Sequence, residues 1–146
     1  MNKSYLLWAF VGMVGYSFTA LLVKLATASG RFSGFFVLMI SASIVVISSA
    51  TITVLRGEMK AFANFATTDG AFLLGTGVAL ALAVISYFHA LSIGPASIVV
   101  PVFGMFIVGG AVLGLLFLHE PLTLRKAIGI LLAIGSIYLI AGHQKP

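Results

Sequence analysis

The chain has 146 residues, of which 61% are hydrophobic and only 8% are charged, and its mean hydropathy is +1.21. A soluble domain is about 45–50% apolar and about 25% charged, so a water-soluble globule of this composition would expose a large apolar surface. Soluble enzymes, secreted domains and disordered tails are therefore excluded, and we expect an integral membrane protein. The absence of cysteine excludes disulfides and thiolate metal sites. The net charge of +5 gathers into no basic patch, so we expect no nucleic-acid partner.

Five stretches are long and apolar enough to cross a hydrocarbon core, which takes about 20 helical residues. They cover residues 5–27, 35–55, 71–91, 97–118 and 125–142. The connections between them are short and leave almost no soluble mass. The sequence thus predicts an all-α fold, an integral membrane bundle of five transmembrane helices that forms one domain over residues 1–146.

The longest connection is residues 56–70, with the sequence RGEMKAFANFATTDG. Its Met59, Phe62 and Phe65 recur every three residues. This spacing leaves two interpretations open, a tethering loop or a short amphipathic helix that lies in the membrane interface. Asp69 is expected to cap the third helix.

Lysine and arginine in short connections predict the orientation, because cytoplasmic loops carry an excess of both. One side holds Lys3, Arg56, Lys60, Arg125 and Lys126. The other side holds Arg31 and Lys145, joined by Lys24 if that side chain snorkels outward. We predict a multi-pass protein of the cytoplasmic or inner membrane, with its N-terminus inside and its C-terminus outside.

Polar side chains at bilayer depth need partners, so they are the first candidates for function. Serines and threonines in the first two spans can bond back to their own helix, and most of them are expected to do so. Tyr16 lies near the middle of the first span, where a hydroxyl on an aromatic ring suits a ligand contact. Lys24 and His89 each lie about one turn from the outer end of a span. Lys24 either snorkels to the headgroups or attracts an anionic group such as a carboxylate, and His89 is either a neutral imidazole bonded to a backbone carbonyl or a group for proton coupling or substrate contact.

Glycines and acids add weaker indications. Gly110 and Gly114 have the spacing of close helix packing, within the bundle or at a subunit interface. All three acids, Glu58, Asp69 and Glu120, fall outside the spans, which disfavours a proton antiporter for cationic drugs. The sequence contains no nucleophile with a base, no metal-ligand spacing and no phosphate-binding loop, so we expect neither an enzyme nor a cofactor or metal site.

The stretch 88–142 resembles the C-terminal part of an EamA domain, the repeat of the drug/metabolite transporter superfamily. The shared residues are Ala90, Leu91, Gly94, Pro95, Ala96, Ser97, Val99, Val100, Pro101, Glu120, Leu122, Thr123, Gly129 and Gly135. Trp8 followed by Lys24 in the first span is similar to a pattern of the same family. Two departures are His119, where glycine commonly precedes the glutamate, and Ile107, near the place of a second proline in the fourth helix.

The resemblance implies a half-transporter, because such transporters join two inverted five-helix halves around a central cavity. Helices one to four of each half line the path. The partners would be the bilayer, a small-molecule substrate and a second half, in a homodimer or a heterodimer. Residues expected to shape the fourth helix and the gate are Gly94, Pro95, Pro101, Gly110, Gly114 and Glu120.

The leading functional hypothesis is a secondary carrier or exporter of small metabolites or drugs that works by alternating access as a dimer. Tyr16, Lys24 and His89 are its candidate substrate-path residues. Two alternatives stay open, a flippase-like subunit that passes a lipid carrier and a membrane scaffold that transports nothing.

Overall fold

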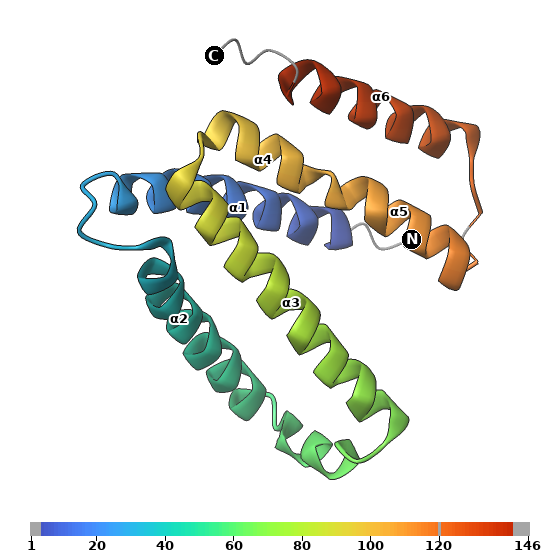
Figure 1. Ribbon diagram of the computed structural model, residues 1–146. Coiled ribbons are helices and arrows are strands. Elements are labelled where there is room, and N and C mark those ends of the chain that lie inside the picture. Colours follow the sequence, from blue (N-terminus) through green and yellow to red (C-terminus); the bar gives the residue numbers. More distant parts are fainter. Residues whose placement is uncertain (1–3, 120, 142–146) are drawn as a thin grey trace. The chain divides into compact units, whose positions relative to one another are not determined.

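The computed structural model describes residues 4–119 and 121–141, and every regular element within these ranges is a helix (Figure 1). The elements are α1 (Ser4–Thr27), α2 (Gly34–Leu55), the 3₁₀ helix η1 (Glu58–Asn64), α3 (Thr68–Ile93), α4 (Ala96–Gly104), α5 (Phe106–Phe117) and α6 (Leu124–Ala141). The predicted all-α fold class is confirmed. The chain divides into two compact units, an N-terminal unit, Met1–Ile93, and a C-terminal unit, Gly94–Pro146.

Four helical stretches of the described chain are long and apolar enough to cross a membrane, namely Ser4–Thr27, Gly34–Leu55, Thr68–Ile93 and Ala96–Phe117. At most 11% of the residues in the most apolar window of any stretch are buried, so these helices expose their apolar side chains to lipid. The fifth predicted span coincides with α6, which is not among the four, and its crossing of the bilayer stays a prediction. Four residues used in the sequence predictions, Lys3, Glu120, Gly142 and Lys145, lie outside the described residues.

The buried core of the N-terminal unit lies where α1 and α3 meet near their C-terminal ends. Its hydrophobic members are Ala20, Val23, Tyr87, Phe88 and Leu91, and Leu91 is completely buried. The two α1 residues are three positions apart, and Tyr87 and Leu91 are four apart, which places each pair on one helix face. The contact between the two helices is therefore a single seam near their C-terminal ends, which we call the α1–α3 seam.

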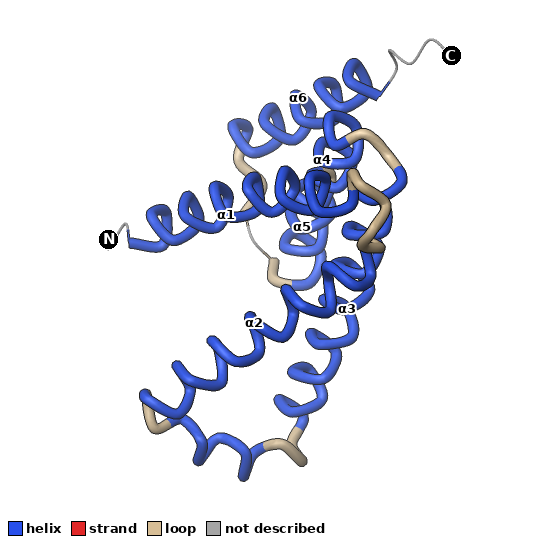
Figure 2. The backbone as a smooth tube through the Cα atoms, turned by 90° about the vertical axis from the view of Figure 1, so that its left-hand side faces the viewer, coloured by secondary structure: helices blue, strands red, loops and turns tan. Residues whose placement is uncertain are grey.

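Helix α2 lies directly against α3 at its first residue, Gly34. A Cβ atom there would lie 2.7 Å from the carbonyl oxygen of Phe88 and 3.0 Å from the side chain of Ser92. Only glycine allows this approach, and the hydroxyl of Ser33 caps the helix by accepting from the N–H of Phe36 at 3.2 Å. From this point α2 and α3 diverge toward η1, which bridges their far ends (Figures 1 and 2).

The connection between α2 and α3 turns sharply at both ends of η1. Gly57 follows α2 with a φ of 69°, a left-handed conformation that glycine adopts without strain. The prediction that Asp69 caps α3 is wrong. The helix begins at Thr68, and Thr67 caps it, because the Thr67 hydroxyl accepts from the N–H of Gly70 at 3.4 Å. Asp69 lies instead in the first turn, where the helix dipole favours a carboxylate.

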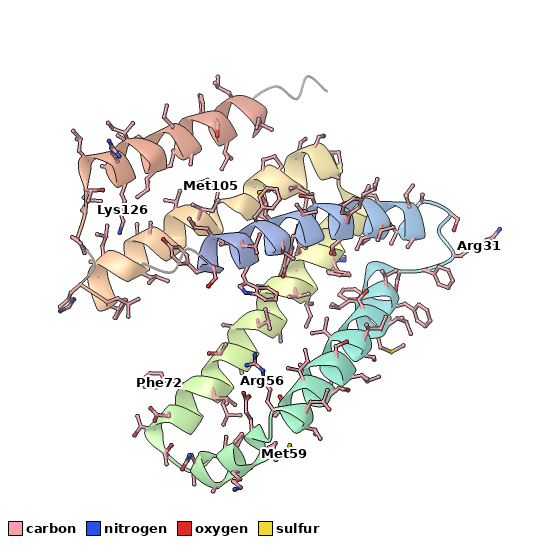
Figure 3. The ribbon with its side chains drawn as sticks, turned by 180° about the vertical axis from the view of Figure 1, so that it is seen from behind. Arg31, Arg56, Met59, Phe72, Met105 and Lys126 are labelled. Carbon is pink, nitrogen blue, oxygen red and sulfur yellow. The ribbon has the colours of Figure 1, made fainter. Side chains whose placement is uncertain are left out.

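The fourth predicted span, 97–118, is divided into α4 and α5 by Met105 (Figure 3). The N–H of Met105 donates to Val102 three residues back, at 3.1 Å, rather than four back. Pro101 lies inside α4, where it removes one helical N–H donor and crowds the preceding turn. The fourth span is therefore interrupted at Met105 even though Ile107 stands near the position where a second proline was expected.

Helix α5 ends in a tight turn. The N–H of Leu118 donates to the carbonyl of Gly114 at 3.1 Å, and His119 follows with a φ of 53°. This left-handed position after a helix is one that glycine fills best. The hydroxyl of Thr123 then caps α6 by accepting from the N–H of Lys126 at 3.3 Å.

Candidate functional site

Lys24 lies in the last turn of α1, and its ammonium donates a hydrogen bond to the backbone carbonyl of Leu91 in α3 at 2.9 Å. In an uninterrupted helix that carbonyl accepts from the N–H four residues later, but that residue is Pro95, which has no N–H. The ammonium therefore binds a carbonyl that the sequence has deprived of its usual helical donor. This bond holds the cation against α3 rather than leaving its position to the flexible lysine chain.

The surroundings of Lys24 favour its positive charge. The side chain is half-buried, and it lies close to the C-terminal ends of both α1 and α3. Helix C-termini carry partial negative charge, and a nearby cation gains about 0.3–1 kcal/mol from each. The ammonium is bonded to a carbonyl of α3 instead of extending away from the helices, and the attraction of an anionic group that the sequence suggested stays a prediction.

Tyr16 faces the same seam two turns away from Lys24. Its ring lies 6.3 Å from the ring of Tyr87 at an interplanar angle of 51°. Tyr87 is buried and also contacts Phe88 edge-on, whereas Tyr16 is 48% exposed. One side of the Tyr16 ring therefore packs on α3 while much of the rest stays accessible.

His89 does not join these two residues. Its ring stacks on Phe35 of α2, with ring centroids 5.0 Å apart and the planes inclined by 13°. His89 lies two positions from Tyr87, and two helical steps rotate a side chain by about 200°, to the other side of α3. The structure thus brings Tyr16 and Lys24 to one seam and places His89 on another, between α2 and α3.

Most of the hydroxyls noted in the first two spans bond to their own helix. Eight of them donate to a carbonyl three or four residues earlier: Ser17, Thr19, Thr27, Ser41, Ser43, Ser49, Thr51 and Thr53. These bonds satisfy the hydroxyls locally. Lys24, in contrast, connects two different helices of the N-terminal unit through its bond to Leu91.

Sequence reasoning missed two members of the seam, Tyr87 and the backbone carbonyl of Leu91. Tyr87 was hidden among apolar neighbours, although it lies one helical turn before Leu91 on the same face. Leu91 had a detectable signal, because a proline four residues later predicts a carbonyl without its helical donor. That signal indicates an acceptor but not which side chain fills it.

The candidate gating residues lie in the C-terminal unit. Gly94 and Pro95 precede α4, and the carbonyl of Pro95 accepts from Ile98 and Val99, each at 3.0 Å. Gly114 is buried, whereas a Cβ at Gly110 would meet, within 4 Å, no described atom beyond the adjacent residues and the backbone of its own helix. Glu120, also predicted to act in gating, lies outside the described residues.

A groove of about 430 Å³ lies between α5 and α6 in the C-terminal unit. It is lined by Ile107, Ala111, Leu115, Leu122, Lys126, Gly129 and Ile130. Lys126 is its charged member, and none of the three predicted substrate-path residues lines it.

Comparisons with known proteins agree with this architecture. The sequence pattern of the EamA-like transporter family matches residues 3–142. A protein of Sinorhizobium sp named "Uncharacterized transporter in cobO 3'region" is 28% identical over 140 residues, which cover 95% of this chain and 98% of that protein. No solved structure gives a significant match. Together with the long apolar helices, the family match shows that the chain is a multi-pass membrane protein of the EamA-like transporter family.

Proposed function

We propose that this protein is a secondary transporter that moves small anionic metabolites or drugs across the cytoplasmic membrane by alternating access, as a dimer. The observation that carries this proposal is the ammonium of Lys24, held by the Leu91 carbonyl within an apolar spanning region. An ionisable group at such a position is expensive in lipid, so it indicates a functional site.

The chemistry of the seam suits a carboxylate. A charge-assisted bond between an ammonium and a carboxylate is about twice as strong as a neutral hydrogen bond, and a low dielectric strengthens it further. The bond to Leu91 positions Lys24 beforehand, so the substrate orders fewer side-chain rotamers on binding. Tyr16 lies eight residues away, about 12 Å along the helix, where its ring can contact the apolar part of the same molecule.

A dimer is proposed because one five-helix repeat supplies only one side of an alternating-access path. The relative named as a transporter has nearly the same extent, since the match covers 98% of it. The five-to-two bias of basic residues favours insertion with the N-terminus inside and the C-terminus outside. That bias favours a parallel homodimer or a partner of opposite orientation over an antiparallel homodimer.

Transport by lysine variants in proteoliposomes tests the role of Lys24. The probes are a set of labelled small carboxylates, with small amines of similar size for comparison. Lys24→Met removes the charge with a similar chain length, Lys24→Arg keeps the charge, and Lys60→Ala removes an exposed lysine of the α2–α3 connection. We expect the rate of carboxylate transport to fall at least tenfold in Lys24→Met, which corresponds to a loss of about 1.4 kcal/mol in binding free energy. Transport should persist in Lys24→Arg and Lys60→Ala.

Equal transport by Lys24→Met and the unaltered protein would assign Lys24 a structural role. Absence of flux in every variant, including the unaltered protein, would contradict transport of carboxylates and favour a lipid carrier or a scaffold. Paired reporters at the C-terminus, one active outside and one active inside, test the orientation. Activity of only the outside reporter is expected, whereas equal activity of both would favour an antiparallel homodimer.

A further inference from the structure

The α2–α3 connection contains a helix whose period matches its apolar residues. Met59, Phe62 and Phe65 recur every three residues, and η1 is a 3₁₀ helix, which has three residues per turn. Met59 and Phe62 therefore lie above one another on a single edge, and Phe65, the residue that ends η1, continues it. In an α-helix the same spacing would spread these side chains over a wider arc.

This apolar edge is exposed. Met59 is 49% exposed, Phe62 is 66% exposed and Phe65 is 45% exposed. The helix joins the ends of two spanning helices, so it lies at a membrane surface (Figure 1). Seven residues of 3₁₀ helix extend about 14 Å, more than the 8–10 Å between packed helices, which agrees with the divergence of α2 and α3 toward it (Figure 2).

Glycines fix the orientation of η1 at both ends. Gly57 precedes η1 in a left-handed conformation, with a φ of 69°. In the first turn of α3, a Cβ atom on Gly70 would collide with the backbone of Phe65. The edge is thus presented by two tight turns rather than by a freely moving tether.

The α2–α3 connection carries no formal net charge that would attract it to anionic lipid. Arg56 and Glu58 form an ion pair at 3.6 Å. Across the connection, Arg56 and Lys60 are balanced by Glu58 and Asp69, so the formal net charge is zero. An anionic lipid surface therefore gains little from it by simple attraction.

We propose that η1 lies in the interfacial layer of the bilayer, with the edge formed by Met59, Phe62 and Phe65 inserted at the boundary between headgroups and acyl chains. Apolar contact rather than anionic lipid holds it there. An interfacial amphipathic helix buries its apolar face about 5–10 Å into this boundary. The insertion sets the depth at which α2 ends and α3 begins.

Tryptophan fluorescence tests the insertion, because the chain has a single tryptophan, Trp8. In a Trp8→Phe background, Phe62→Trp places the reporter on the apolar edge and Ala61→Trp places it on the neighbouring edge. Both proteins are reconstituted in phosphatidylcholine vesicles, some with bromine near the headgroup end of the acyl chains and some with bromine near the far end.

The expected result is a blue-shifted emission for Phe62→Trp, with strong quenching by the shallow bromines and weak quenching by the deep ones. Ala61→Trp should emit at longer wavelength and be quenched less. Both positions are exposed, so both variants should fold, and elution as one sharp peak in detergent checks this. Equal quenching of the two reporters, or water-like emission from both, would overturn the proposal.

A second pair of vesicles tests whether the insertion depends on anionic lipid. Adding phosphatidylglycerol, or raising the salt concentration, should leave the quenching of Phe62→Trp unchanged. Quenching that requires phosphatidylglycerol would replace apolar insertion with binding to anionic headgroups and would overturn the proposal.

Discussion

The two compact units of this transporter protein differ in how much of their own structure they bury. All five buried hydrophobic side chains of the described chain lie in the N-terminal unit, at the crossing of α1 and α3. In residues 94–119 and 121–140 of the C-terminal unit, the buried residue is Gly114. The comparison indicates that the first unit is stabilised by contacts of its own, whereas the second leaves its helix surfaces for lipid or for a partner.

Crowded glycines occur in the N-terminal unit, although Gly12, Gly15, Gly75 and Gly77 of the same unit are open. Gly34 and Gly70 of the N-terminal unit each lie against backbone atoms that leave no room for a Cβ atom. A Cβ at Gly109, Gly110 or Gly129 of the C-terminal unit would meet no described atom within 4 Å. Small residues let membrane helices approach closely, so the open glycines mark surfaces suited to a helix from another molecule.

The sharpest test of this contrast replaces a crowded glycine. Gly34→Ala should lower the free energy of unfolding by about 2–3 kcal/mol, because its Cβ would lie 2.7 Å from the Phe88 carbonyl. Gly75→Ala, at an open position within α3, should instead be neutral or stabilising by up to about 1 kcal/mol. Unfolding in mixed micelles with rising dodecyl sulfate measures both, and equal effects would remove the distinction between crowded and open sites.

A buried leucine gives the next largest effect. Leu91→Ala should destabilise the protein by about 2 kcal/mol. In water such a substitution loses both hydrophobic transfer energy and packing around the cavity, but lipid is as apolar as leucine, so only the packing loss applies here. Leu132→Ala in α6, where the leucine is 69% exposed, should change stability by less than about 0.5 kcal/mol. The same unfolding titration applies, and a similar loss at Leu132 would show that α6 packs as firmly as the seam.

The turn after α5 offers a gain in stability. His119→Gly should stabilise the C-terminal unit by about 1 kcal/mol, because a φ of 53° is costly for histidine and free for glycine. His89→Gly should cost about 1 kcal/mol, since glycine within a helix is unfavourable and the stacking on Phe35 is lost. The thermal unfolding midpoint of each variant measures these effects. A lower midpoint for His119→Gly would contradict the left-handed turn.

The smallest effect on the protomer is expected at an open glycine of α5. Gly110→Ala should stabilise the isolated chain by about 0.5 kcal/mol, or leave it unchanged, because its Cβ meets no described atom. If the C-terminal unit is the dimer surface, this variant should nevertheless weaken self-association in detergent, measured by cross-linking yield. Unchanged cross-linking would assign the open face of α5 to lipid.

Composition and hydropathy predicted the membrane class and the positions of the helices well, because long apolar runs have few alternatives in lipid. They predicted the fourth span but not its interruption at Met105, where the N–H donates three residues back to Val102. Thr67 rather than Asp69 caps α3. Both residue types suit a helix N-cap, so the sequence does not tell which of the two begins the helix. Single-residue boundaries of this kind are settled by backbone geometry rather than by residue type.

The candidate site was predicted as residues but not as an arrangement. Hydropathy identified Lys24, His89 and Tyr16 by their depth, and depth says nothing about which face of a helix a residue occupies. The separation of His89 from the other two depends on the rotation of α3 against α1 and α2. Whether any of the three contacts substrate stays a prediction.

The division of the chain at Ile93 has a consequence for biosynthesis. The hydrogen bond from Lys24 to the Leu91 carbonyl joins two residues of the first 93, so it can form as soon as α3 leaves the ribosome. Translating residues 94–146 takes about 3–10 s at about 5–20 residues per second, far longer than the microseconds in which helices form. The N-terminal unit therefore has time to assemble in the bilayer before the helices of the C-terminal unit are inserted.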